Sequence, residues 1–441
     1  MLLLLVAGLT LLNCGSSSNS SSTTTTSGIK DRAFFSEEVS AGTISSGVYI
    51  VDAQNDTRPA ASPISAGNTP GMMVLTPNRN QTLVFSASEN QLTMIDNATE
   101  SGTNHVTLPG FTESIVVSPD SSTAYAAVPT AAVVGQSPGA VKVVSLGSAA
   151  FAGEVDIPSV RYLSIDNSGN RVLAFSDNSD TVTVITPSNI GLGNAVTYVG
   201  GFDRPVAAFF SSDDTTAFVV NCGAECGGTQ ASVQTLDLTT NTASVTPVNV
   251  PAASVAMVNG STMYLAGTPF ALVNGNLVPT LLCSMGDNTT QATYCGQLTI
   301  FDLTSMSVVN ATTTIVITDG YHNRLALGAN GQLFIGARTC TKITLPNATN
   351  EVRGCLSIYN TLTTAVGSVQ PNGVTVPPTN GDVTGIQPIA KRTVVYVVQN
   401  GALLIYDTTT DALEYNPNNP NSPGEIFNLV GEFVDVKTPD F

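Results

Sequence analysis

The sequence predicts an all-β fold, namely a β-propeller of eight four-stranded blades, with seven blades as the alternative. Short apolar runs alternate with turn residues from Lys30 to the C-terminus, and none of them keeps the periodicity of an amphipathic helix. These runs recur in units of similar length and order. The chain has 441 residues, and a ring of repeated blades lets one domain reach that size.

The residues before the repeats carry an export signal. Leu2 to Leu12 is an apolar run, too short for a membrane-spanning helix, which needs about 20 residues. The run ends at Leu12-Asn13-Cys14-Gly15, which resembles the lipobox of bacterial lipoproteins. The resemblance implies that residues 1–13 are a signal peptide and that Cys14 is lipidated and begins the mature chain. An ordinary cleaved signal peptide with an incidental cysteine is the alternative.

A polar segment separates Cys14 from the repeats. Ser16 to Ser27 is Ser or Thr at every position except Asn19, so it has no apolar surface to bury and predicts a flexible tether. We therefore expect a lipidated tether at residues 14–29 and a single propeller domain at residues 30–441. The lipid would be its sole contact with a membrane, and its location would be the bacterial cell envelope, at the outer membrane or the cell surface.

The repeat unit has a recognisable second and third strand. The second strands are expected at 32–37, 82–87, 123–128, 171–176, 216–221, 262–266, 332–337 and 393–399. The third strands are expected at 47–52, 91–96, 140–145, 181–186, 232–237, 297–302, 355–360 and 402–407. Each series has eight members, which is why eight blades are favoured.

Two units also show a family resemblance. Val395-Tyr396-Val397-Val398-Gln399-Asn400-Gly401 and the following Leu404-Ile405-Tyr406-Asp407 resemble the YVTN-type repeats of bacterial surface and lactonase-like propellers, as does Gln91-Leu92-Thr93-Met94-Ile95-Asp96. The resemblance covers most of the repeat region. It implies a propeller, and it keeps a lactonase-like hydrolase among the candidate activities.

The ends of the chain are expected to share one blade. The first unit begins at its second strand, and the run from Phe433 to Thr438 can supply the missing innermost strand and close the ring. Most third strands end in Asp, and the others end in Ser, Thr or Asn. Such side chains accept hydrogen bonds from backbone N–H groups just downstream and so start the turn into the fourth strand.

Antiparallel strands sort the connections onto two faces. The connections between second and third strands, and those between blades, lie on one face, and this face receives the insertions at 267–296 and 338–354. We expect the working face here, because function on a scaffold fold usually lies on variable loops. Two apolar runs around Asn274-Gly275 predict a hairpin in the first insertion. It could bind a partner or fold over a neighbouring blade.

Six cysteines remain after Cys14. The repeat places them in sequential pairs at the connections between second and third strands, which predicts the disulfides Cys222–Cys226, Cys283–Cys295 and Cys340–Cys355 in an exported protein. Zinc binding is the weaker alternative, because no pair has a histidine at finger spacing. We expect neither a metal centre nor a cofactor.

Scarce charged residues gather where the chain enters the innermost strands, at the mouth of the central channel. These candidate ligand-binding residues are Glu113, Arg161, Asp203, Arg204, His322, Arg324 and Asp382. An arginine fork suits a carboxylate or phosphate, so a small anionic ligand is one interpretation. Pairing of these charged groups with one another is the other.

Composition excludes some functions. With 15 Lys and Arg against 32 Asp and Glu, the formal charge is −17, which argues against a nucleic-acid partner. Two histidines and no tryptophan disfavour histidine-rich copper propellers and propellers that dock a quinone against tryptophan.

Two functions from different classes remain. The preferred one is a monomeric binding or scaffolding propeller whose long-loop face engages an envelope protein or a glycan. The alternative is a lactonase-like hydrolase that would use Glu113, Asp203, His322 or Asp382 at the channel mouth. The sequence contains no nucleophile elbow or phosphate-binding loop that would decide between them.

Overall fold

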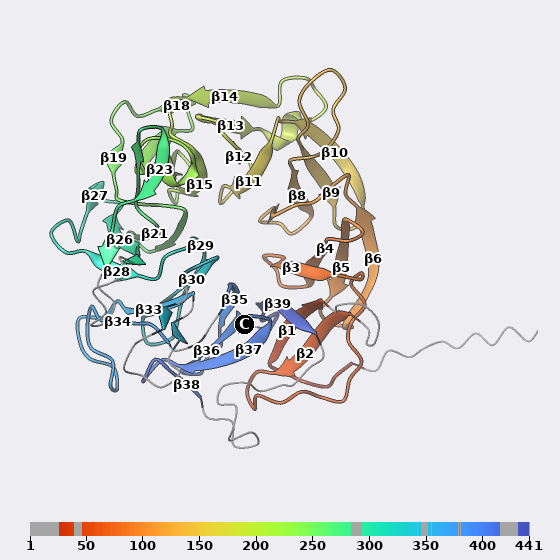
Figure 1. Cartoon of the computed structure of the whole chain (residues 1–441). Helices are drawn as coiled ribbons and strands as arrows, with labels where there is room; N and C mark the ends of the chain where they lie inside the picture. The colour runs from red at the N-terminus through yellow and green to blue at the C-terminus, as the bar shows by residue number, and fades with distance from the viewer. Residues whose placement is uncertain are drawn as a thin grey trace, which may run out of the picture.

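The structure is a computed structural model that describes residues 26–38, 46–283, 293–341, 343–344, 352–353, 355–377, 379, 381–414 and 431–440. The expected signal peptide, Cys14 and most of the tether lie outside these residues. The described chain folds as an eight-bladed β-propeller, with the sheets arranged radially around a central channel (Figure 1). Within the described residues, no helix is long and apolar enough to cross a membrane.

The first four blades, each given from the channel outward, contain the following strands. They are β39 (Glu432–Lys437), β1 (Arg32–Glu38) and β2 (Gly47–Asp52); β3 (Pro70–Leu75), β4 (Gln81–Ser86), β5 (Gln91–Asp96) and β6 (Ser101–Thr107); β7 (Ser114–Val117), β8 (Thr123–Val128), β9 (Ala140–Ser145) and β10 (Ala150–Asp156); β11 (Val160–Ile165), β12 (Val172–Ser176), β13 (Thr181–Ile185) and β14 (Val196–Gly200).

The last four blades are built in the same way. They contain β15 (Pro205–Phe210), β16 (Thr216–Asn221), β17 (Ser232–Asp237), β18 (Thr242–Ala243) and β19 (Val248–Asn249); β20 (Val255–Asn259), β21 (Thr262–Gly267), β26 (Gly296–Asp302), β27 (Ser307–Val308) and β28 (Ile315–Ile317); β29 (Tyr321–Leu327), β30 (Gln332–Arg338), β33 (Leu356–Asn360) and β34 (Val374–Thr375); β35 (Val383–Pro388), β36 (Val394–Gln399), β37 (Ala402–Asp407) and β38 (Ala412–Leu413).

Short hairpins and 3-10 turns lie in the connections between the blade strands. They are the hairpins β22 (Phe270–Val273) with β23 (Asn276–Pro279), β24 (Leu282–Cys283) with β25 (Thr293–Tyr294) and β31 (Ile343–Thr344) with β32 (Val352–Arg353), and the 3-10 turns η1 (Pro187–Asn189) and η2 (Gly223–Cys226). The three hairpins all lie in connections between second and third strands. The expected strands agree with the structure, apart from shifts of one residue at some ends.

Blade 1 joins the two ends of the chain, as the sequence predicts. β39 pairs antiparallel with β1 and takes the innermost place (Figure 1). Phe433 is 4% exposed and Val436 is fully buried. The Asp435 carboxylate accepts a hydrogen bond at 2.9 Å from the backbone N–H of Met73, in the inner strand of blade 2. The last strand is therefore fixed to the first blade and also to its neighbour.

The hydrophobic core is divided among the spaces between blades. It consists of eight clusters, each contributed by two adjacent blades, and one of them joins blade 8 to blade 1 through Phe35, Tyr396 and Phe433. A middle strand is covered on both faces, so its apolar residues form an uninterrupted run, as in Val394–Gln399, which is buried throughout. Inner strands such as Val160–Ile165 combine buried and half-buried positions, because their free edge borders the channel.

The turn after the third strand has the predicted chemistry. Asp52, Asp96, Asp237, Asp302 and Asp407 each accept a hydrogen bond from the N–H group two residues downstream, at 2.6–3.0 Å. Asn360 does the same for Leu362 at 3.1 Å. The recurring aspartates therefore serve the fold.

Two of the predicted disulfides are present. Cys222 is bonded to Cys226 and Cys340 to Cys355, with Cα–Cα distances of 5.6 and 5.4 Å. The third predicted pair, Cys283 with Cys295, involves a side chain outside the described part of the structure. Both observed bridges lie in connections between second and third strands, on the face that carries the hairpins. We call this surface, with Gly223–Gln230, Thr268–Leu281 and Arg338–Cys340, the long-loop face.

Candidate binding face and central channel

A cavity of about 640 Å³ opens at the channel mouth on the long-loop face. Its wall includes four of the candidate residues, namely Glu113, Arg161, Arg204 and Asp382. Asp177, Asn178, Glu225 and Thr339 reach it from connections between second and third strands. The structure therefore brings part of the predicted set together at one end of the channel.

Arg161 is held by two carboxylates. Its Nε and Nη2 form a bidentate pair with Asp177 at 2.6 Å, and its Nη1 lies 2.6 Å from an oxygen of Glu113. These hydrogen bonds, that of Asp177 foremost, raise the pKa of the Arg161 guanidinium. All three side chains are about one-third exposed, at 34–37%. Arg161 therefore matches the interpretation in which the charged groups pair with one another.

Arg204 and Asp203 have separate roles. The Arg204 Nη1 lies 3.1 Å from Asp180, while its Nε is buried with no hydrogen-bond partner. The Asp203 carboxylate accepts hydrogen bonds from the backbone N–H groups of Thr229 and Gln230, at 3.0 and 2.8 Å. It thus fastens the end of the Cys222–Cys226 loop and is not among the residues that line the mouth cavity.

Asp382 is also tied to a loop. One oxygen accepts a hydrogen bond at 2.8 Å from the backbone N–H of Thr339, and the other lies 3.9 Å from the Arg338 Nε. Both Asp382 and Arg338 are nearly half exposed, at 42% and 49%. The pair is therefore weak and open to solvent.

His322 and Arg324 lie on β29, deeper in the channel than the mouth residues. His322 is fully buried, its Nε2 is 2.9 Å from the carbonyl oxygen of Thr318, and burial lowers its pKa to about 4. The imidazole is therefore neutral at physiological pH, and its Nδ1 has no hydrogen-bond partner among the described residues. Arg324 donates to the backbone carbonyls of Thr384 and Asn323, at 2.9 and 3.0 Å.

Three further residues line the channel or its mouth, and the sequence-based prediction did not include them. The Tyr162 and Tyr321 hydroxyls are 2.6 Å apart although the residues are 159 positions apart in sequence, and burial raises the pKa of both phenols. They come from blades 4 and 7, so their hydrogen bond spans the channel. Each stands directly beside a selected residue, Arg161 or His322, in an innermost strand. This adjacency is the feature of the sequence that could have identified the two tyrosines.

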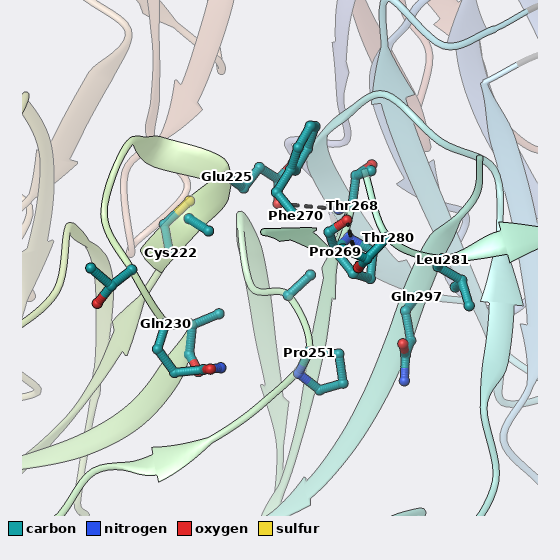
Figure 2. A pocket seen from close by; sticks show the side chains of 14 residues that line it. Cys222, Glu225, Gln230, Pro251, Thr268, Pro269, Phe270, Thr280, Leu281 and Gln297 are labelled. Atoms are coloured by element: carbon teal, nitrogen blue, oxygen red, sulfur yellow. Dashed lines mark hydrogen bonds between the residues drawn. The ribbon is translucent and has the colours of Figure 1, made fainter. Parts of the chain in front are cut away.

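The third is Glu225, the one acidic residue between the bridged Cys222 and Cys226. It borders the mouth cavity and a second cavity of about 280 Å³ between blades 5 and 6, and in Figure 2 it lies near Phe270 and Thr268. An oxygen of Glu225 accepts a hydrogen bond at 3.1 Å from the backbone N–H of Thr268. Burial raises the pKa of Glu225 to about 8, so this carboxyl is largely protonated at neutral pH.

The hairpin of β22 and β23 folds over the neighbouring blade. β22 packs against η2, inside the disulfide-bridged loop of blade 5. Its outer part, next to the Asn274-Gly275 turn, remains in solvent, with Leu272, Val273 and Leu277 exposed by 51%, 50% and 42%. Both interpretations of the predicted hairpin therefore apply, one to its base and one to its outer part. Among the described residues, no group of three or more His, Cys, Asp or Glu is arranged to hold a metal ion.

No protein-family model and no curated protein sequence matches this chain. Solved structures do match. Hydrazine synthase of Kuenenia stuttgartiensis is 15% identical, with a TM-score of 0.54, over 80% of this chain and 99% of that chain. The dihydro-heme d1 dehydrogenase NirN in complex with DHE is 11% identical, with a TM-score of 0.57, over 93% and 75%. A eukaryotic initiation factor is 11% identical, with a TM-score of 0.51, over 93% and 98%. At such identities the similarity shows the fold alone.

Proposed function

We propose that this protein is a lipid-anchored propeller of the bacterial cell envelope, with YVTN-type repeats, and that it binds an envelope protein or a glycan through the long-loop face. One observation carries the binding role. On this face, a loop fastened by a disulfide supports a hairpin whose outer part exposes Val273 and the paired side chains of Leu272 and Leu277. Clustered exposed apolar side chains on a preformed support are typical of protein interaction sites.

The chemistry of the hairpin favours a protein over a glycan. Its exposed apolar side chains are aliphatic, whereas a sugar ring packs best on an aromatic face. The charge of −17 favours a partner with a basic or neutral surface.

A pair of variants tests the face. Leu272→Asp with Leu277→Asp places two charges on the hairpin. We expect this variant to lose a partner that co-purifies with the wild-type protein from detergent-solubilised envelopes, and to bind that purified partner at least about tenfold more weakly. Leu192→Asp is the matched control, because Leu192 is 72% exposed in the connection between β13 and β14, on the opposite face. Equal binding by both variants would exclude the hairpin, and competition by a purified glycan would identify a sugar ligand.

The anchor has its own test. Replacing Cys14 with Ser removes the sulfur that would carry the lipid, so the protein is expected to move from the membrane fraction to the soluble exported fraction. Fractionation followed by immunoblotting measures this. Continued membrane association of the Cys14→Ser protein would contradict lipidation.

A lactonase-like hydrolase is the second candidate, and one observation favours it. Glu225 borders the mouth cavity as a carboxylic acid that keeps its proton near neutral pH, as a general acid must. Hydrolysis of a panel of sugar and aliphatic lactones by the wild-type protein, lost in Glu225→Gln, would establish this activity. Turnover that is equal in the two proteins would exclude Glu225 as the acid.

A further inference from the structure

The central channel contains a chamber beneath the mouth cavity. Its volume is about 450 Å³, within the usual range of small-molecule sites. All eight blades contribute to its wall. Tyr162 and Tyr321 line the chamber and also the mouth cavity, so their hydrogen-bonded hydroxyls mark the boundary between the two spaces.

The chamber has an apolar side and a polar side. Met72, Phe85, Phe111, Val206 and Val255 supply apolar surface from blades 2, 3, 5 and 6. The polar side comes from blades 7 and 8, where the Asn323 Oδ1 and the Thr384 Oγ1 are buried without a hydrogen-bond partner. Buried polar atoms without partners are uncommon and costly, and a bound ligand would supply the missing hydrogen bonds.

Arg324 stands on the polar side, and no carboxylate of the described residues pairs with it. Among the described residues, it takes part in none of the ion pairs, whereas Arg161, Arg204 and Arg338 each have a carboxylate partner. Its two hydrogen bonds go to neutral backbone carbonyls, through Nε and Nη1. The Nη2 group and the remaining Nη1 hydrogen are left for another acceptor.

The acidic groups around the chamber are already engaged or lie at its rim. Asp435 binds the N–H of Met73 and the Lys437 ammonium, at 2.9 Å each. Glu113 is held by Arg161. Glu38 is solvent-exposed. Arg324 therefore remains as the unneutralised charge on the polar side.

We propose that this chamber binds a small amphipathic carboxylate, whose carboxylate pairs with Arg324 and whose apolar part packs on Met72, Phe85 and Phe111. An amine or hydroxyl group on the same molecule would reach the Asn323 Oδ1 and the Thr384 Oγ1. This site lies inside the channel and does not depend on a partner at the long-loop face.

Matched acids and amides test the charge requirement. The probes are phenylacetate, 4-hydroxyphenylacetate and hexanoate, each compared with its neutral amide by isothermal titration and by the shift in melting temperature. We expect at least one acid to bind about tenfold or more tightly than its amide, because only the acid can form a charge-assisted pair with a guanidinium. In Arg324→Gln the acid should fall to the affinity of the amide, while the affinity of the amide stays within about threefold.

Two further variants show where the acid binds and control for loss of binding through misfolding. Arg204→Gln removes a charge from the mouth cavity, on the other side of the tyrosine pair, and should leave acid binding within about twofold. Arg324→Lys keeps the charge but loses the fork, and should give an intermediate affinity. The proposal is overturned if no acid stabilises the wild-type protein more than its amide at millimolar concentration. It is also overturned if Arg204→Gln, and not Arg324→Gln, removes the preference for acids.

Discussion

Removing residues 431–441 is expected to unfold the whole propeller, not only its first blade. This truncation deletes β39, so β1 loses its inner partner and the cluster between blades 8 and 1 loses Phe433 and Val436. The seam between blades 8 and 1 would then depend on β1 and β2 alone, and the inner edge of β1 would be unpaired. Circular dichroism and size-exclusion chromatography measure the outcome, and a truncated protein that melts cooperatively as a monomer would show that closure is dispensable.

A point substitution tests the contribution of ring closure to stability without removing the strand. Phe433→Ala should lower the free energy of unfolding by about 3–5 kcal/mol, because Phe433 is 4% exposed and packs on Phe35 at a ring-centroid distance of 5.3 Å. Phe151→Ala is the matched control, since Phe151 is 48% exposed on the outer strand of blade 3, and should cost less than about 1 kcal/mol. Urea unfolding measures both. Equal losses would mean that closure through Phe433 contributes nothing specific.

Glu225 is expected to make the folded protein less stable as the pH rises. Burial raises its pKa from an ordinary value of 4.5 to about 8, so between these pH values the folded protein keeps a proton that the unfolded chain has released. Stability therefore falls across that range. Above about pH 8, Glu225 is ionised in both the folded and the unfolded protein, so it causes no further loss of stability.

The variant Glu225→Gln removes the titrating group while keeping an oxygen for the Thr268 N–H. Relative to the wild-type protein, its free energy of unfolding should rise by a few kcal/mol between about pH 5 and pH 9. Urea unfolding at several pH values measures the difference. Glu154→Gln, at a surface ion pair where Glu154 is 40% exposed, is the control and should change stability by less than about 1 kcal/mol. A pH-independent difference between Glu225→Gln and wild type would contradict the buried proton.

The architecture was predictable because each blade repeats one local pattern. Strands with apolar residues on both faces, such as Val394–Gln399, and turns started by Asp96 or Asp407 can be identified within a few neighbouring residues. The closing strand at Glu432–Lys437 was predictable for a different reason. The first unit lacks an innermost strand, and the apolar run after the eighth unit belongs to no other blade, so the two are expected to pair.

The candidate site was less predictable because charge pairing depends on tertiary packing. The sequence grouped Arg161, Arg204 and Arg324 by their place in the repeat. The structure pairs the first two with Asp177 and Asp180, which lie in the connection between β12 and β13. The third has no carboxylate partner in the part of the chain that the structure describes. Nothing local shows that Asp203 is occupied by the N–H groups of Thr229 and Gln230, or that Tyr162 meets Tyr321 across the channel.

The pairing of β1 with β39 also constrains the order of events during synthesis. Blade 1 is the first to be made and the last to be completed, because its innermost strand begins at residue 432 of 441. Until those residues arrive, β1 presents an unpaired strand edge of the kind that recruits other chains. Contacts between the two ends of a chain also form slowly. For this protein, the risk of aggregation is therefore highest in the interval between the synthesis of β1 and β2 and the synthesis of β39.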